Sequence, residues 1–254
     1  MKRNELKKCL LVLVGAVAAV ACTASPAAAQ SWSERVLISV NGAFQSTTHD
    51  ASDRFEFEKN LETGTTDVDY SVQGGFVFDG GVSYRVWKNL AGGVSVSYFT
   101  RDESAGTTSS IPHPFFFQQP RIVTGDATGV KRTETAVHVQ AVYLVNPGGK
   151  LRMAFSGGPT FFNLEQDLVT EATVTEAYPF DTVTFATAAK RRESGSTVTF
   201  NVGADLMWML SRQFGIGGLV RFSPASVDLD APGNRTISVD GGGVYAGGGI
   251  RILF

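Results

Sequence analysis

The last eleven residues of the chain alternate strictly between two kinds of side chain. Every second residue, counted back from the C-terminus, is apolar or small: Phe254, Ile252, Ile250, Gly248, Ala246 and Val244. The residues between them are mixed and partly polar, and they include Arg251 and Tyr245. A period of two is typical of a β-strand, because successive side chains point to opposite faces. The segment therefore predicts a strand with one face against an apolar phase and the other against a polar one.

Seven further segments alternate in the same way, and they set the size of the fold. Their apolar faces lie within residues 36–44, 76–86, 90–98, 137–145, 151–157, 198–210 and 214–222. Short turns near 87–89, 146–149 and 211–213 alternate with long polar stretches near 46–72, 101–132, 164–195 and 224–236. Eight strands with this asymmetry favour a closed membrane barrel, since a soluble sandwich or lipocalin would have a polar outer face. We predict an all-β fold: an eight-stranded antiparallel up-and-down transmembrane β-barrel with short periplasmic turns and long extracellular loops.

The two-faced strands and the terminal Phe254 resemble the small eight-stranded outer-membrane β-barrel family, the OmpA-like and OmpX-like barrel domains. The resemblance covers nearly all of residues 30–254. It implies a place in the cell outer membrane, contact with membrane lipid and lipopolysaccharide, and assembly by the barrel-assembly machinery, which reads Phe254 as a sorting signal. We expect no periplasmic peptidoglycan-binding domain, because the strand at 244–254 ends the sequence.

The N-terminal segment has the features of a cleaved secretory signal peptide. Four basic residues lie within positions 2–8, and an apolar stretch of 12 residues runs from Leu10 to Ala21. Ala27–Ala29 then supplies the small residues that a signal peptidase needs. A lipoprotein site at Cys22 is the alternative, but Ala19 stands where a larger aliphatic residue is usual. The predicted division is a signal peptide over 1–29 and a barrel domain over 30–254.

Removal of residues 1–29 changes the charge and the redox properties of the chain. The remainder has 18 basic and 23 acidic residues, a net charge of −5, and it has no cysteine. A chain that crosses an oxidising periplasm without thiols forms no disulfide. The negative charge argues against nucleic acid as a partner. We expect a monomer that binds no cofactor.

The residues that alternate with the apolar face are expected to fill the lumen, because an eight-stranded barrel is just wide enough for side chains. The charged members of this inward set are Asp79, Arg85, Glu134, Arg152, Asp205, Arg221 and Arg251. Unpaired charges there are costly, so we predict ion pairs, with Arg251 bonded to Asp205 or another luminal acid. Two interpretations follow: a polar core that closes the barrel, or a charged constriction in a narrow channel or carrier for a small solute.

The sequence offers little that is typical of an enzyme or a metal site. Of the three histidines, His138 points inward by parity, away from lipid substrates, and His49 and His113 lie in predicted loops. Asp228 and Asp230 lie in a turn that lacks the other ligands of a calcium loop. We therefore expect no catalytic residue, no metal and no cofactor.

The polar stretches carry the remaining signals. Three consecutive phenylalanines, Phe115, Phe116 and Phe117, follow a proline-rich segment. They could pack over the barrel mouth, enter the outer leaflet, or form a patch for an extracellular ligand of unknown identity. Residues 168–188 predict a hairpin with its turn near 178–181. The basic run 190–192 lies near the point where the chain is expected to re-enter the bilayer, where it could snorkel or contact lipid phosphates. The predicted function is a non-catalytic structural or surface-interaction role carried by these loops.

Overall fold

The computed structural model describes residues 34–231 and 235–254, so the predicted signal peptide lies outside the described residues. The described chain forms ten strands: β1 (Val36–Gln45), β2 (His49–Lys59), β3 (Glu62–Val72), β4 (Gly75–Trp87), β5 (Leu90–Ile111), β6 (Arg121–Gly148), β7 (Leu151–Glu176), β8 (Val183–Met209), β9 (Phe214–Ala231) and β10 (Arg235–Leu253). Within those residues, no helix has the length and apolar character needed to cross a membrane.

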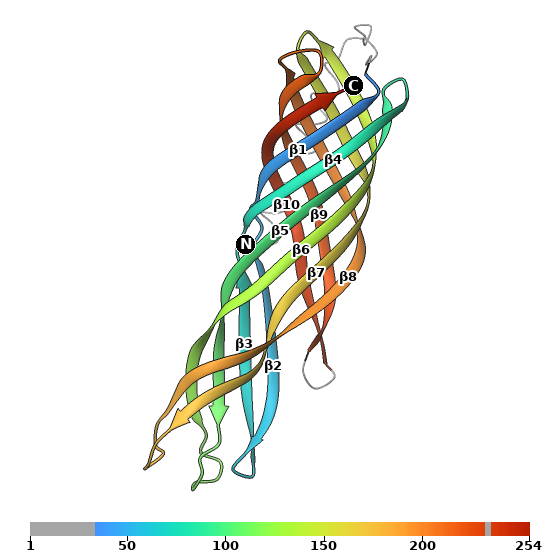
Figure 1. Cartoon of the computed structure of the whole chain (residues 1–254). Coiled ribbons are helices and arrows are strands. Elements are labelled where there is room, and N and C mark those ends of the chain that lie inside the picture. The colour runs from blue at the N-terminus through green and yellow to red at the C-terminus, as the bar shows by residue number, and fades with distance from the viewer. Residues whose placement is uncertain (1–33, 232–234) are drawn as a thin grey trace, which may run out of the picture.

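Eight of the strands close into a ring (Figure 1). Their order is β5-β4-β1-β10-β9-β8-β7-β6, and a further pairing between β5 and β6 closes the ring. The first and last strands of the ring are adjacent and antiparallel, with Val40 opposite Ile250. Closure pairs the backbone groups of each strand with both neighbours, which is what a sheet within lipid requires. The eight-stranded barrel predicted from the alternation is confirmed.

The outside of the ring carries a continuous apolar band. On β8 the exposed side chains are Val198, Phe200, Val202, Leu206 and Trp208, which is the face predicted from the sequence. Exposed aromatic side chains lie toward both borders of the band: Phe44, Phe76, Phe78, Tyr98, Phe161 and Phe200 toward one, and Tyr84, Trp87, Tyr143, Trp208, Phe214 and Phe254 toward the short turns. An apolar band between two aromatic girdles is typical of a transmembrane barrel.

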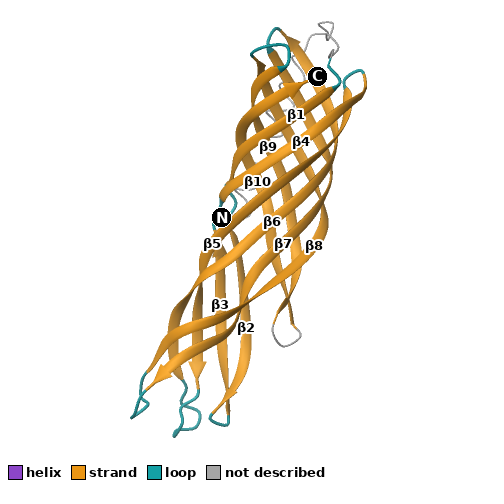
Figure 2. Cartoon of the chain, in the orientation of Figure 1, coloured by secondary structure: helices purple, strands orange, loops and turns teal. Residues whose placement is uncertain are grey.

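Several strands continue far beyond this band (Figure 2). The strands β5, β6, β7 and β8 are 22, 28, 26 and 27 residues long, whereas about 9–11 residues span a membrane. The hairpin of β2 and β3 joins them, because β3 pairs with β5 over Thr65–Tyr70. The stretches expected as loops are thus mostly strand. We call residues 46–72, 101–132, 164–195 and 224–240, as far as the structure describes them, the extension.

The hairpin predicted for the third polar stretch is present. The strand β7 ends at Glu176 and β8 begins at Val183. The two strands pair along their length, from Leu151 opposite Trp208 to Glu176 opposite Val183. High densities of threonine and valine favoured strand over coil here, and the structure agrees.

The extension has its own hydrophobic core. Its buried members include Phe55, Val68, Tyr70, Leu164, Leu168, Val169, Val227, Leu229 and Val239. The Tyr70 hydroxyl accepts a hydrogen bond from the Val169 amide at 2.8 Å, and burial raises the pKa of Tyr70 to about 12. A second cluster fills the lumen near the short turns, with Leu37, Val142, Leu144, Met207, Met209 and Leu253. The inward face is therefore apolar at both ends, which the partly polar pattern did not indicate.

Candidate functional site

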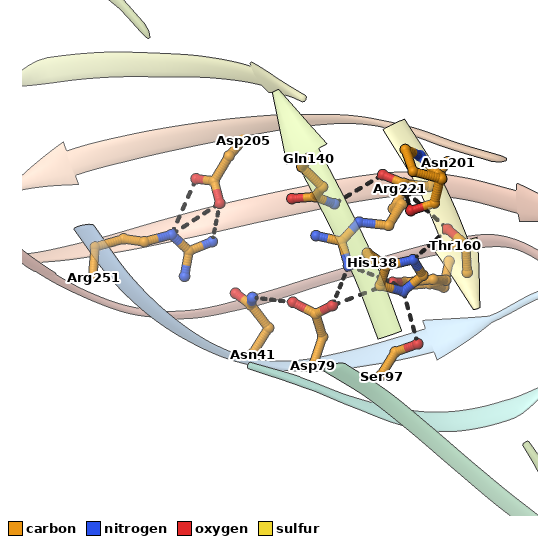
Figure 3. A network of polar contacts seen from close by, with 12 residues as sticks. Asn41, Asp79, Ser97, His138, Gln140, Thr160, Asn201, Asp205, Arg221 and Arg251 are labelled. Atoms are coloured by element: carbon orange, nitrogen blue, oxygen red, sulfur yellow. Dashed lines mark hydrogen bonds and ion pairs between the residues drawn. The ribbon is translucent and has the colours of Figure 1, made fainter. Parts of the chain in front are cut away.

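The middle of the lumen holds a polar network between these apolar regions (Figure 3). The Asp79 carboxylate accepts hydrogen bonds from Asn41 Nδ2 at 3.0 Å and from the Tyr245 hydroxyl at 3.2 Å. The same carboxylate forms a close ion pair with Arg221, whose Nη1 also donates to the Tyr245 hydroxyl at 2.8 Å. The side chains of Arg221 and Asp79 are 5% and 1% exposed. Each charge in this group is thus compensated inside the protein.

His138 lies beside this group with both ring nitrogens engaged. Its Nε2 is 3.1 Å from Ser97 Oγ, and its Nδ1 is 2.8 Å from Thr160 Oγ1. Asn201 Nδ2 donates to the same Thr160 hydroxyl at 2.9 Å, and Gln140 Nε2 donates to Asn201 Oδ1 at 2.8 Å. The histidine is fully buried, and these contacts join the four neighbouring strands β5, β6, β7 and β8.

The ion pair predicted between Arg251 and Asp205 is present. Arg251 Nε lies 3.1 and 3.0 Å from the two Asp205 oxygens, and Nη2 lies 2.6 Å from Oδ2. The Arg251 side chain is completely buried and that of Asp205 is 14% exposed. The pair joins β10 and β8 over the inner face of the intervening strand β9 (Figure 3).

The third acid predicted for the lumen, Glu134, forms an ion pair with a residue outside the predicted set. Arg132 Nε donates to Glu134 Oε1 at 2.8 Å. The other carboxylate oxygen of Glu134, Oε2, accepts a hydrogen bond from the Gly242 amide at 3.0 Å. Arg132 was missed because it lies in a stretch expected to be a loop, although it shares the inward parity of Glu134.

Arg152 and Arg85 lie apart from these groups, toward the short turns. Arg152 Nη1 lies 2.9 Å from Glu34 Oε2, so one partner of this arginine precedes the first strand. Arg85 is half-buried on β4, and its amide donates to the Arg35 carbonyl at 2.8 Å.

One small cavity lies beside this network. A cavity of about 10 Å³ is lined by residues that include Gln45, Ser97, Glu134 and Tyr245, and such a volume holds about one water molecule. The polar network adjoins the apolar cluster near the short turns and a second cluster that contains Val77, Phe99 and the network's own Tyr245. This arrangement favours the interpretation of a polar core that closes the barrel.

Three hairpin ends meet at the far end of the extension (Figure 2). Lys59 Nζ, at the end of β2, lies 2.9 Å from Glu176 Oε2 at the end of β7. Arg121, at the start of β6, donates to Glu176 Oε1 at 2.6 Å, to the Phe180 carbonyl at 2.9 Å and to the Pro112 carbonyl at 2.8 Å. The three ends are therefore joined to one another by charged side chains.

Glu176 is the shared acceptor of this junction. Burial alone would raise the pKa of the Glu176 carboxyl, but hydrogen bonds and charge from Lys59 and Arg121 outweigh it and hold the pKa below its ordinary value of 4.5. The carboxylate is therefore ionised at neutral pH and bonded on both oxygens.

The three phenylalanines lie in this end region and are open to solvent. Phe115, Phe116 and Phe117 are 62%, 54% and 67% exposed. The His113 ring accepts the amides of Phe115 and Phe116 at 3.1 and 3.2 Å, which orders the turn. The strand β5 continues 13 residues beyond Tyr98, which puts the phenylalanines about 30 Å outside the band at the rise of a tilted strand. This distance and the exposure of the three rings oppose packing over the mouth and entry into the outer leaflet.

The basic run of residues 190–192 is engaged within the protein. Lys190 Nζ donates to the carbonyls of Thr128 and Gly129 at 2.7 and 2.8 Å. Arg191 pairs with Glu193, and Arg192 Nε lies 3.1 Å from Asp167 Oδ1. The placement of this run against lipid phosphates is therefore not supported.

Two kinds of comparison with known proteins found nothing: no family model and no curated protein matches the chain. The chain is similar to solved barrels at low identity. These include OprG of Pseudomonas aeruginosa (8% identity, TM-score 0.44, 88% of this chain and 97% of that one) and Neisserial surface protein A (9%, 0.41, 86% and 97%). The outer membrane protease OmpT of Escherichia coli matches at 6% identity and a TM-score of 0.48, over 91% and 100% of the two chains.

The assignment of the fold rests on the strand pairing and on the surface. Eight strands form a closed hydrogen-bonded ring, and the exposed side chains of that ring form an apolar band with aromatic borders. The chain is therefore an eight-stranded transmembrane β-barrel of the outer-membrane type.

Proposed function

We propose that the protein is a non-catalytic outer-membrane barrel with a surface-interaction role carried by the extension. One observation supports this most directly. The large apolar side chains that the extension exposes are all at its far end: Leu61, Phe115, Phe116, Phe117, Ile122 and Tyr178. Exposed apolar groups gathered in one place mark interaction sites on soluble surfaces. We call these six residues the aromatic tip.

In this proposal the barrel is a scaffold. Its band lies in membrane lipid beside lipopolysaccharide, and the barrel-assembly machinery recognises Phe254. The lumen contributes stability, since its charges are paired and its histidine bonds hydroxyl groups. A catalytic base needs access to a substrate, and burial of His138 opposes such a role.

A narrow channel or carrier is the second candidate, and one observation favours it. Among the described residues, Asn41 Oδ1, Ser95 Oγ, Arg221 Nε and Ser223 Oγ are buried without a hydrogen-bond partner. Buried polar atoms of this kind are commonly bonded to water. Water in the lumen would fit either candidate, but the apolar side chains that pack around the network oppose continuous passage.

The proposal requires the aromatic tip to lie outside the cell, and cysteine labelling tests this. Residues 30–254 contain no cysteine, so one introduced thiol reports one position. Gln119→Cys is at the exposed far end of the extension, and Arg212→Cys is in an exposed short turn. A membrane-impermeant maleimide should label the first variant on intact cells and the second only after lysis. The reverse pattern would contradict the proposal.

A further inference from the structure

We infer that the aromatic tip is a docking surface for a polypeptide that presents apolar side chains within a basic border. The inference rests on the proposed function and specifies the chemistry of the partner. Its basis is the combination of three properties of the tip, namely its isolation on the surface, its fixed geometry and the charge of the extension around it.

The aromatic tip is isolated on the surface. Leu61 is 95% exposed and Tyr178 is 84% exposed. Between the tip and the membrane band, the outward residues of β2 and β3 are polar, such as Ser52, Glu56 and Asp69. Aromatic side chains dominate the energetics of protein interfaces when a partner buries them. A tip of six apolar residues beyond a polar stretch fits a specific contact surface.

The geometry of the tip is fixed by contacts behind it. Arg121, with its side chain 8% exposed, binds the Pro112 and Phe180 carbonyls as well as Glu176. Asn60 Nδ2 donates to the Pro112 carbonyl at 3.0 Å. The rings of Phe115 and Phe180 meet edge to face at 5.6 Å. A preordered surface loses less conformational entropy when it binds, which favours a shape-specific partner such as a folded polypeptide.

The charge of the extension selects among partners. It contains 19 acidic and ten basic residues, a net charge of −9. Two of the basic residues nearest the tip, Lys59 and Arg121, are bonded to Glu176. Like charges therefore disfavour an anionic lipid surface and a second copy of this chain, whereas a partner with lysine or arginine around its apolar residues is attracted.

The test uses the mature protein in nanodiscs and three fluorescent peptides of equal length. The first combines phenylalanine and leucine with lysine. The second replaces every lysine with glutamate, and the third replaces every apolar residue with serine. The wild type is compared with the double variant Phe115→Ser/Phe117→Ser, and Ser52→Ala/Thr108→Ala is the matched control on the exposed side of the extension. Empty nanodiscs correct for partition of peptide into lipid.

We expect the apolar basic peptide to bind the wild type and the control about tenfold more tightly than either other peptide, because one of these lacks the attractive charge and the other lacks the apolar side chains. The double variant should lose this preference. Equal binding of the apolar basic peptide to all three proteins would overturn the inference. Binding of phosphatidylcholine vesicles that depends on the tip, without any preference among the peptides, would overturn the inference and indicate a membrane as the partner. Pairing of nanodiscs that depends on the tip would overturn it and indicate self-association.

Failure of this inference is distinguishable from failure of the proposed function. If Gln119→Cys is labelled on intact cells but the peptides do not discriminate, the partner chemistry is wrong and the display role stands. If Gln119→Cys is labelled only after lysis, the proposed function fails, and the inference fails with it.

Discussion

Arg251 on β10 binds Asp205 on β8 through three contacts of 2.6–3.1 Å, across the intervening strand β9. The space for the arginine comes from Gly217 on β9. A Cβ added at Gly217 would lie 3.0 Å from Arg251 Nε and 2.9 Å from the Leu206 carbonyl oxygen. A glycine, an arginine and an aspartate on three adjacent strands thus form one packing unit.

Loss of Arg251 should destabilise the barrel because it leaves the Asp205 carboxylate buried without its partner. We expect Arg251→Ala to lower the free energy of unfolding by about 3–5 kcal/mol, and Arg251→Met/Asp205→Leu to recover most of this loss. Urea unfolding of purified barrels measures both. Arg54→Ala is the control, since Arg54 and Asp67 are 66% and 38% exposed and such pairs contribute about 1 kcal/mol or less. Equal losses for Arg54→Ala and Arg251→Ala would contradict the role of the buried pair.

Phe254→Ser should separate assembly from stability. The Phe254 side chain is 59% exposed on the outside of the barrel, and its amide bonds the Val36 carbonyl at 3.0 Å without the ring. We expect less assembled barrel on semi-native gels, while the barrels that form unfold at nearly the wild-type urea concentration. Ile250 lies on the same face and is 56% exposed. Ile250→Ser should leave the amount of assembled barrel near the wild-type level but lower its stability to urea, because it removes a lipid contact worth about 1.5–3 kcal/mol. Matching profiles for the two variants would count against a sorting role of Phe254.

The junction at the tip should loosen in acid. The pKa of Glu176 is lowered in the folded protein, so its contribution is present above the ordinary value of 4.5 and is lost as the pH falls through the lower folded value. Pepsin, which cuts beside aromatic residues and works at low pH, should cleave the 112–120 segment faster as this occurs. Rates are normalised to a free peptide of the same segment. Glu176→Gln should be cleaved rapidly with no such transition, and an identical pH profile for the two proteins would show that Glu176 does not hold the tip.

The strands of the ring could be predicted from the sequence because one face of each lies against lipid. The alternation of apolar and polar side chains over residues such as Val198 to Leu210 then indicates a strand with its apolar face toward lipid. The same parity predicts that Asp205 and Arg251 point into the lumen. Because the lumen is narrow and an unpaired buried charge is costly, an ion pair between them is expected.

The interior of the extension could not be predicted in the same way. Its strands have polar outer faces, so the sequence predicts a polar loop for residues such as Val68 and Tyr70, which are buried. Arg132 was missed for this reason, although strand parity from Glu134 would have indicated it. The meeting of Lys59, Arg121 and Glu176 depends on three hairpins that lie far apart in the sequence, and no local pattern reports such contacts.

The central claim is that the lumen is closed and that the protein acts through the extension. Single-channel recording of the wild type in planar bilayers tests this most directly, with Arg221→Ala as the companion variant because Arg221 binds Asp79 in the middle of the lumen. We predict that the wild type inserts and stays electrically silent across the voltage range of the experiment. Steady unitary steps in the wild type, changed in size by Arg221→Ala, would contradict the claim and favour a narrow channel.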